Sequence, residues 1–158
     1  MATRTLILMR HGKSDWSQPA TDRERPLNAR GRRQAAEAGR WLAAQRSPID
    51  LAMVSPARRA ADAWALAAAE LVSPPPVRIE EHAYTFDGLE LLGVVRDLGE
   101  EERVVLVGHN PACEELLELL TGQGAVMKTS ALAVLQLASW RSSGRLVAHG
   151  RPPGERRV

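Results

Sequence analysis

Hydrophobic positions along the chain follow two alternating patterns. Short apolar runs recur, as in strands that are buried on both faces. Between them lie longer segments whose apolar residues stand three or four positions apart, the spacing of a helix with one buried face. Alternating strands and helices predict an α/β domain with a largely parallel central sheet, covered by helices on both sides in a three-layer α/β/α arrangement.

The apolar runs predict six strands. Thr5 to Met9 opens the series, and "RVVLV" at 103–107 is the clearest of them. A weaker run follows the helix-breaking "SPPP" at 73–76. The last two strands are predicted to form a hairpin around Ser142-Ser143-Gly144. In chain order the predicted strands cover residues 5–9, 51–54, 77–80, 103–107, 131–138 and 145–149.

Capping residues mark where the predicted helices begin. Asn28 and Asp87 each stand at the position of a helix N-cap, directly ahead of an amphipathic segment. Pro56 stands at a first-turn position, ahead of an alanine-rich helix that extends to about Leu71. A fourth helix is expected after Pro111. The predicted helices therefore follow the first four strands, as crossover connections of a parallel sheet require.

The length and the C-terminus set the domain boundaries. A chain of 158 residues suits a single domain with a substantial core. The last nine residues, "GRPPGERRV", contain few apolar side chains. We therefore predict one domain over residues 1–149 and a disordered tail over residues 150–158.

The composition is that of an ordinary soluble globular protein, with 44% hydrophobic and 25% charged residues. No apolar run reaches the roughly 18 to 20 residues of a membrane span, and the N-terminus does not resemble a signal peptide. These features predict a cytoplasmic protein that does not associate with membranes. The single cysteine, Cys113, excludes an intramolecular disulfide and a multi-cysteine metal site.

Basic residues are numerous but interleaved with acidic ones, which leaves a formal net charge of +2. Nucleic-acid binding is therefore not expected. The densest basic segment, from Arg23 to Arg33, could track phosphates, but a solvated loop and helix start explains it better.

Polar residues follow each of the first four predicted strands. In an open parallel sheet, ligands bind beyond the carboxyl ends of the strands, so these residues should meet at one edge. They are Arg10-His11, Ser55 to Arg59, Glu80-Glu81 and Gly108-His109. This edge is the predicted functional site.

Two arginines and two histidines at one edge suit a dianionic tetrahedral group such as phosphate. Guanidinium groups bind phosphate oxygens in pairs and stay charged near neutral pH. They also depress the pKa of a neighbouring imidazole, which keeps it neutral and nucleophilic. The same cations would repel a metal ion, and no nucleotide-binding P-loop is present. The pattern predicts phosphoryl chemistry without a metal or another cofactor.

Four motifs in this order resemble the histidine phosphatase superfamily, which also contains the phosphoglycerate mutases. They are "RHGKSDW", "RPLNARGRRQAAEAGRWL", "SPARRA" and "VVLVGHNP". The short chain and the "RPL" and "GHNP" segments are similar to the small SixA-like branch, the phosphohistidine phosphatases. The resemblance covers about residues 5 to 138 and implies a phosphoglycerate-mutase-like fold.

The resemblance implies a role for each strand-end residue. His11 would be the phosphorylated nucleophile and Arg10 a phosphate clamp. The second family arginine stands four residues after the serine of "SPARRA", which selects Arg59 over Arg58. His109 would donate a hydrogen bond to the phosphoryl oxygens.

Three further residues are weaker candidates. Arg25 could line the mouth of the pocket, and Ser17 could add a hydroxyl group to the phosphate. Glu81 stands three residues before Tyr84, as a glutamate does in several superfamily members, and would protonate the leaving group.

The sequence leaves three functions open. The leading hypothesis is a metal-independent phosphatase that works through phosphohistidine on His11 and acts on phosphohistidine in proteins. A small-molecule phosphomonoesterase would need Glu81 as a working acid. A phosphate- or phosphopeptide-binding module is the third, although a binding module has no use for a nucleophile. The expected partner is a phosphorylated protein or a small phosphorylated substrate, and the sequence does not predict an oligomeric state.

Overall fold

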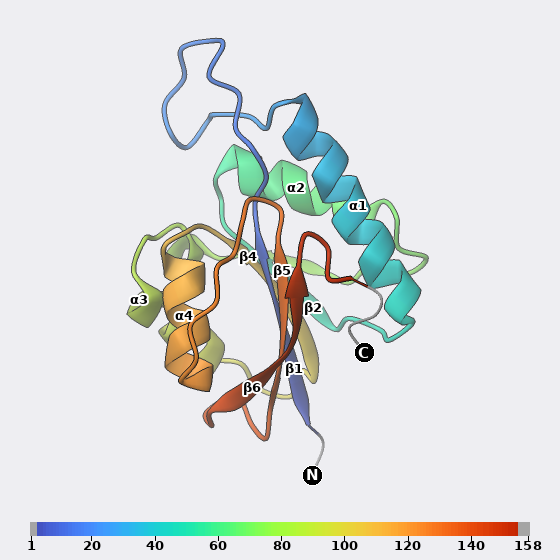
Figure 1. Ribbon diagram of the computed structural model, residues 1–158, viewed down its shortest axis with the longest axis vertical. Coiled ribbons are helices and arrows are strands. Elements are labelled where there is room, and N and C mark those ends of the chain that lie inside the picture. The colour runs from blue at the N-terminus through green and yellow to red at the C-terminus, as the bar shows by residue number, and fades with distance from the viewer. Residues whose placement is uncertain (1–2, 155–158) are drawn as a thin grey trace.

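The computed structural model describes residues 3–154, which form a six-stranded sheet between two pairs of helices (Figure 1). Helices α1 and α2 cover one face of the sheet, and α3 and α4 cover the other (Figure 1). This arrangement confirms the predicted three-layer α/β/α architecture. The sheet is the frame that positions the candidate site.

The strands lie in the order β3-β2-β4-β1-β5-β6. β3, β2, β4 and β1 are parallel, whereas β5 runs antiparallel to both β1 and β6. The carboxyl ends of the four parallel strands therefore meet at one edge. Their bounds are β1 Arg4–Arg10, β2 Leu51–Val54, β3 Val77–Ile79, β4 Arg103–Gly108, β5 Leu132–Leu137 and β6 Gly144–Gly150.

Both predicted N-caps are present. The side chain of Asn28 accepts a hydrogen bond from Gly31 N, and that of Asp87 accepts one from Leu89 N. No helix within residues 3–154 has the length and apolar character needed to cross a membrane. The helices are α1 Ala29–Gln45, α2 Arg58–Ala68, α3 Gly88–Arg96 and α4 Ala112–Thr121, with a short 3₁₀ helix η1 at Glu81–Ala83.

Helix α2 is shorter than predicted at both ends. It begins at Arg58, with Ala57 rather than Pro56 as the flanking residue, and ends at Ala68. It packs closely on α1, because a Cβ placed on Gly39 would lie only 2.2 Å from the carbonyl oxygen of Ala67. This close contact holds the C-terminal end of α2 against α1, while Arg58 N at its first turn donates to the carbonyl oxygen of Arg23 at 2.8 Å.

Side chains of β1 alternate between the two halves of the core. Leu6 and Leu8 pack against the α3–α4 side, and Ile7 and Met9 against the α1–α2 side. All four side chains are fully buried, and each contributes roughly 1.5–3 kcal/mol to the stability of the fold. The alternation fixes the register of β1 and therefore where the residues that follow it emerge.

Residues 150–154 belong to the predicted disordered tail, but the structure places this segment against the rest of the domain. Gly150 ends β6 and is paired with Leu132, and Arg151 Nε donates a hydrogen bond to Thr129 O at 2.7 Å. Pro153 is buried. Strand pairing at Gly150 and the hydrogen bond of Arg151 hold this segment against the domain, although it contains few large apolar residues. The remainder of the predicted tail, residues 155–158, lies outside the described residues.

Candidate active site

The two histidines lie side by side because their strands are neighbours. Arg10 of β1 pairs with Gly108 of β4, so His11 and His109 leave the sheet together. Their ring centroids are 5.0 Å apart and the ring planes make an angle of 58°. The structure therefore places the two histidines together at the ends of their strands.

The carbonyl oxygen of Gly12 holds the imidazole of His11 in one tautomer. Its Nδ1 lies 2.8 Å from the carbonyl oxygen of Gly12, which can only accept a hydrogen bond. Nδ1 therefore carries the proton, and Nε2 keeps a lone pair. Burial, with further contributions from Arg59 and Arg10, lowers the pKa of His11 to about 4. Near pH 7 the imidazole is neutral and Nε2 can act as a nucleophile.

Arg59 lies against this lone pair. Its Nε donates to His11 Nε2 at 3.3 Å, and its side chain is only 5% exposed. Arg58, the residue before it, has a side chain that is 55% exposed and pairs with Asp62 one helical turn away at 3.6 Å. The structure therefore places Arg59, and not Arg58, beside His11.

Arg10 is anchored on the α3–α4 side of the sheet. Its Nη1 donates to the carbonyl oxygen of Met127 at 3.0 Å, and its buried Nε has no partner within the described chain. Burial lowers the pKa of this guanidinium, which nevertheless stays charged at neutral pH.

His109 is almost fully buried and contacts Ser55. Its Nε2 lies 2.8 Å from Ser55 Oγ, which also accepts a hydrogen bond from Ala57 N. Its buried Nδ1 has no partner within residues 3–154. Burial first, and then His11 and Arg59, lower the pKa of His109 to about 3. The ring is therefore neutral near pH 7, and its buried Nδ1 is unpaired within residues 3–154.

Asp22 also reaches this cluster, although no motif in the sequence indicates that it does. Its backbone carbonyl oxygen and Oδ2 accept hydrogen bonds from Arg59, and Oδ2 also accepts one from the hydroxyl group of Tyr84. The Tyr84 and Arg59 hydrogen bonds lower the pKa of Asp22. The ring of Tyr84 lies 5.4 Å from that of His109. Asp22 thus binds the terminal nitrogens of Arg59, while the Nε of Arg59 donates to His11.

Comparison with known proteins decides the family. A sequence model of the histidine phosphatase superfamily (branch 1) matches residues 6–83. The chain belongs to the histidine phosphatase superfamily. It is 31% identical over 142 residues to the Mycobacterium tuberculosis protein Rv1276c, and this alignment covers 82% of this chain and 87% of Rv1276c.

Solved structures assigned as phosphohistidine phosphatases are similar over nearly the whole domain. One is assigned as SixA of Nakamurella multipartitia, with 26% identity and a TM-score of 0.83, covering 95% of this chain and 96% of that one. Another, assigned as SixA of Agrobacterium tumefaciens, also has 26% identity and a TM-score of 0.83, covering 93% and 97%.

Glu81, the glutamate compared with the acid of other histidine phosphatases, does not join the cluster. Its side chain is 67% exposed, and both carboxylate oxygens accept hydrogen bonds from Arg23 at 3.3 Å. It makes no hydrogen bond to either histidine or to Arg59. The predicted proton donor is therefore a solvated, paired carboxylate in this structure.

Arg25 and Ser17 lie on the loop that leads to α1, away from the histidines. Arg25 is buried, donates to the carbonyl oxygen of Ala20 at 3.0 Å and stacks 3.5 Å above the ring of Trp16. Ser17 is exposed and hydrogen-bonds to Asp15 through both its side chain and its backbone N–H. Neither side chain contacts the strand-end cluster, because local contacts within the loop determine where each lies.

The nearby residues do not form a conventional metal site. Within residues 3–154, no three His, Cys, Asp or Glu side chains are grouped so that they could hold a metal ion. Cys113 is fully buried, which raises the pKa of its thiol to about 12.

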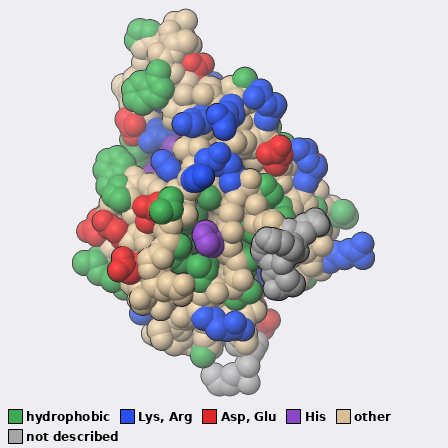
Figure 2. Space-filling view, viewed as in Figure 1, with side chains coloured by type: hydrophobic (Ala, Val, Ile, Leu, Met, Phe, Trp, Pro, Cys, Tyr) green, Lys and Arg blue, Asp and Glu red, His purple; other side chains and the backbone are tan. Residues whose placement is uncertain are grey.

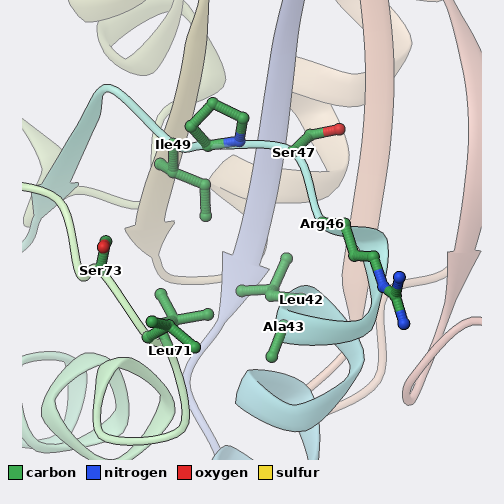
Figure 3. Close-up of a pocket in the computed structure, with 9 residues that line it drawn as sticks. Leu42, Ala43, Arg46, Ser47, Ile49, Leu71 and Ser73 are labelled. Carbon is green, nitrogen blue, oxygen red and sulfur yellow. The ribbon is translucent and has the colours of Figure 1, made fainter.

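A separate apolar hollow of about 300 Å³ lies at the other end of α1 (Figure 3). Leu42, Ile49 and Leu71 face one another across it (Figure 3). It lies at the end of α1 remote from His11, so it is not part of the histidine cluster.

Proposed function

We propose that this chain is a metal-independent phosphatase that forms a phosphohistidine intermediate on His11 and acts on phosphohistidine in proteins. The observation that carries the proposal is the state of His11. Its Nδ1–H donates to the carbonyl oxygen of Gly12, and its Nε2 lone pair accepts a hydrogen bond from Arg59 Nε. A nucleophile and an anion-binding group thus share one pocket.

In the proposed first step, His11 Nε2 attacks the phosphorus atom of the substrate. A new N–P bond forms while the N–P bond to the substrate imidazole breaks, and the bonding electrons pass to the departing nitrogen. A solvent proton neutralises this nitrogen. Arg10 and Arg59 hold the phosphoryl oxygens, and the hydrogen bond from Arg59 Nε transfers from His11 to one of those oxygens.

In the second step, water attacks the phosphoryl group on His11. The N–P bond breaks, inorganic phosphate leaves, and the electron pair returns to Nε2. His109 is suited to assist both steps. When the hydroxyl group of Ser55 donates to His109 Nε2, the unpaired Nδ1 carries a proton that can be donated to a phosphoryl oxygen.

The carboxylates near the cluster favour a phosphoramidate over an ester as the substrate. An alkoxide needs a positioned acid in order to leave, whereas a protonated imidazole leaves as a neutral molecule. Glu81 is solvated, and the lowered pKa of Asp22 keeps its carboxyl group ionised. The similarity to proteins assigned as phosphohistidine phosphatases points the same way.

The test compares turnover of a phosphohistidine peptide with that of an alkyl phosphate ester, each with and without excess chelator. We expect the peptide to be the better substrate and the chelator to have no effect. Acid lability and base stability of the trapped phosphoryl enzyme would identify phosphohistidine. A chelator-induced loss that only added metal restores would overturn the mechanism, and preference for the ester would overturn the substrate assignment.

A further inference from the structure

Helix α1 begins against the residues that follow His11. The backbone N–H of Asn28 donates to the carbonyl oxygen of Lys13 at 2.8 Å. A Cβ placed on Gly12 would lie 2.8 Å from the Cα of Gly31, so a side chain there would separate the two segments. The first turn of α1 is therefore part of the surface beside the histidine cluster.

Four exposed cations occupy this junction. They are Lys13, Arg30, Arg32 and Arg33, which we call the α1 basic surface. Within residues 3–154 none of these four side chains makes a hydrogen bond or an ion pair. Arginines nearby do have acidic partners: Arg23 pairs with Glu81, Arg40 with Glu70 and Arg58 with Asp62. Figure 2 shows Lys and Arg side chains gathered over this part of the molecule.

The dipole of helix α1 disfavours these arginines. The N-terminus of a helix carries a partial positive charge, which favours acidic side chains and disfavours basic ones. The first turn of α1 contains no acidic residue, whereas those of α3 and α4 contain Glu90 and Glu114–Glu115. The unpaired cations thus stand where the helix dipole opposes them, and a negatively charged partner would relieve this.

The opposite side of the histidine cluster carries carboxylates. Glu80 and Glu81 lie at η1, and Glu90 lies at the start of α3. Figure 2 shows acidic side chains gathered toward the α3 side of the molecule. A partner with acidic residues on one flank is attracted by α1 and repelled by η1 and α3, which fixes its orientation.

We infer that the α1 basic surface docks phosphoproteins whose phosphohistidine is flanked by aspartate or glutamate. This inference rests on the proposed function and adds the kind of partner to it. The reacting phosphoryl group enters the histidine cluster while neighbouring acidic side chains meet Lys13 and the arginines of α1. Attraction of this kind between exposed charges is screened by salt.

The experiment uses two phosphohistidine peptides of equal length, one with three flanking glutamates and one with three glutamines. We expect the chain to prefer the glutamate peptide by about tenfold in kcat/KM at low salt, and to lose this preference at high salt. The variant Arg30→Glu/Arg33→Glu should abolish the preference. Turnover of p-nitrophenyl phosphate should stay unchanged, and the melting temperature should not fall, because glutamate suits a helix N-terminus.

The matched control is Arg141→Glu/Arg145→Glu, which makes the same charge change in the turn before β6 and at the start of that strand. This turn lies at the edge of the sheet opposite His11. The control should keep the preference for the glutamate peptide. A preference lost equally in both variants would show that net charge alone is responsible and would overturn the inference.

Binding of the unphosphorylated glutamate peptide, followed by fluorescence anisotropy, separates this inference from the proposed function. Failure to hydrolyse either phosphopeptide would refute the proposed function. The docking inference would then stand only if the Arg30→Glu/Arg33→Glu variant binds the unphosphorylated peptide more weakly than the unsubstituted chain does. Equal turnover of both peptides, together with no salt-dependent binding, would overturn the docking surface and leave the phosphatase intact. Tighter binding of a short single-stranded DNA at the same arginines would overturn the inference and indicate that the partner is a nucleic acid rather than an acidic protein.

Discussion

The two sides of the candidate pocket are built in different ways. On the strand side, Arg10, His11 and His109 follow from β1 and β4, whose pairing continues to the last residue of each strand. On the loop side, Asp22 is held by side-chain contacts to Arg59 and Tyr84, while Glu81 lies outside the cluster and pairs with Arg23. Strand pairing sets the position of each residue through the register of the strands. The position of a loop residue is set instead by its individual side-chain contacts.

The electrostatics of the two sides differ as well. Burial lowers the pKa of both histidines on the strand side, which keeps them neutral. On the loop side, hydrogen bonds hold Asp22 in its ionised form. We therefore assign the bond-making steps to the strand side and the positioning of Arg59 to the loop side.

The largest expected effect is at His11. His11→Ala should reduce turnover of a phosphohistidine peptide by at least about 10³-fold, because it removes the group that accepts the phosphoryl. The melting temperature should change by less than about 4 °C, since His11 lies beyond the strand end rather than in the core. Rapid-quench kinetics and thermal unfolding would check this. Residual activity of more than a few per cent in a normally folded variant would contradict covalent catalysis.

Arg59→Ala should raise the dissociation constant for vanadate by about 10- to 100-fold, the cost of one lost charge-assisted clamp. Arg58→Ala should raise it less than about fivefold, because an exposed ion pair contributes little. Isothermal titration calorimetry of the two variants makes the comparison. A larger effect at Arg58 would show that the other arginine binds the anion.

Stability should depend on pH through the histidine pair. Both pKa values lie below the unfolded value near 6.5, so the unfolded chain binds more protons below that pH. The free energy of unfolding should therefore fall between pH 6.5 and about 4, as measured by urea denaturation. The double variant His11→Asn/His109→Asn should show a shallower fall.

His82 provides the control for this titration, because its hydrogen bond to Glu90 raises its pKa. It contributes stability in its charged form, so His82→Asn should not make the fall shallower. A double variant with the slope of the unsubstituted chain would show that the two strand-side histidines do not titrate as described.

The smallest effect is expected on the loop side at Glu81. Glu81→Gln should change turnover of both a phosphohistidine peptide and an alkyl phosphate ester by less than about fivefold, because the side chain is exposed and pairs with Arg23. Arg23→Gln is the matched control, since it breaks the same ion pair from the other end. A selective loss on the ester in the Glu81 variant alone would restore Glu81 as a proton donor.

The sequence predicted best what regular secondary structure dictates. Strand periodicity and the cap residues Asn28 and Asp87 gave the layers, and the end of each parallel strand gave the positions of His11, Arg59 and His109. The family resemblance selected Arg59 over Arg58, which spacing alone could not do.

Contacts between loops could not be predicted in the same way. Asp22 stands in a segment without periodicity, and nothing in its local sequence indicates that it reaches Arg59 from 37 residues away. The C-terminal segment was judged by its apolar content, although backbone pairing at Gly150 and burial of Pro153 order it. Both depend on groups that are distant in the sequence.

The pairing of β1 with β4 also determines when the pocket can form during synthesis. Thr5 aligns with Arg103, so β1 is synthesised long before its parallel neighbour β4 exists. Closing so long a loop is slow, and contacts of high sequence separation slow folding. Until then four large apolar side chains of β1 stay exposed. The proposed activity therefore requires synthesis to continue past β4, because a shortened chain lacking β4 also lacks His109.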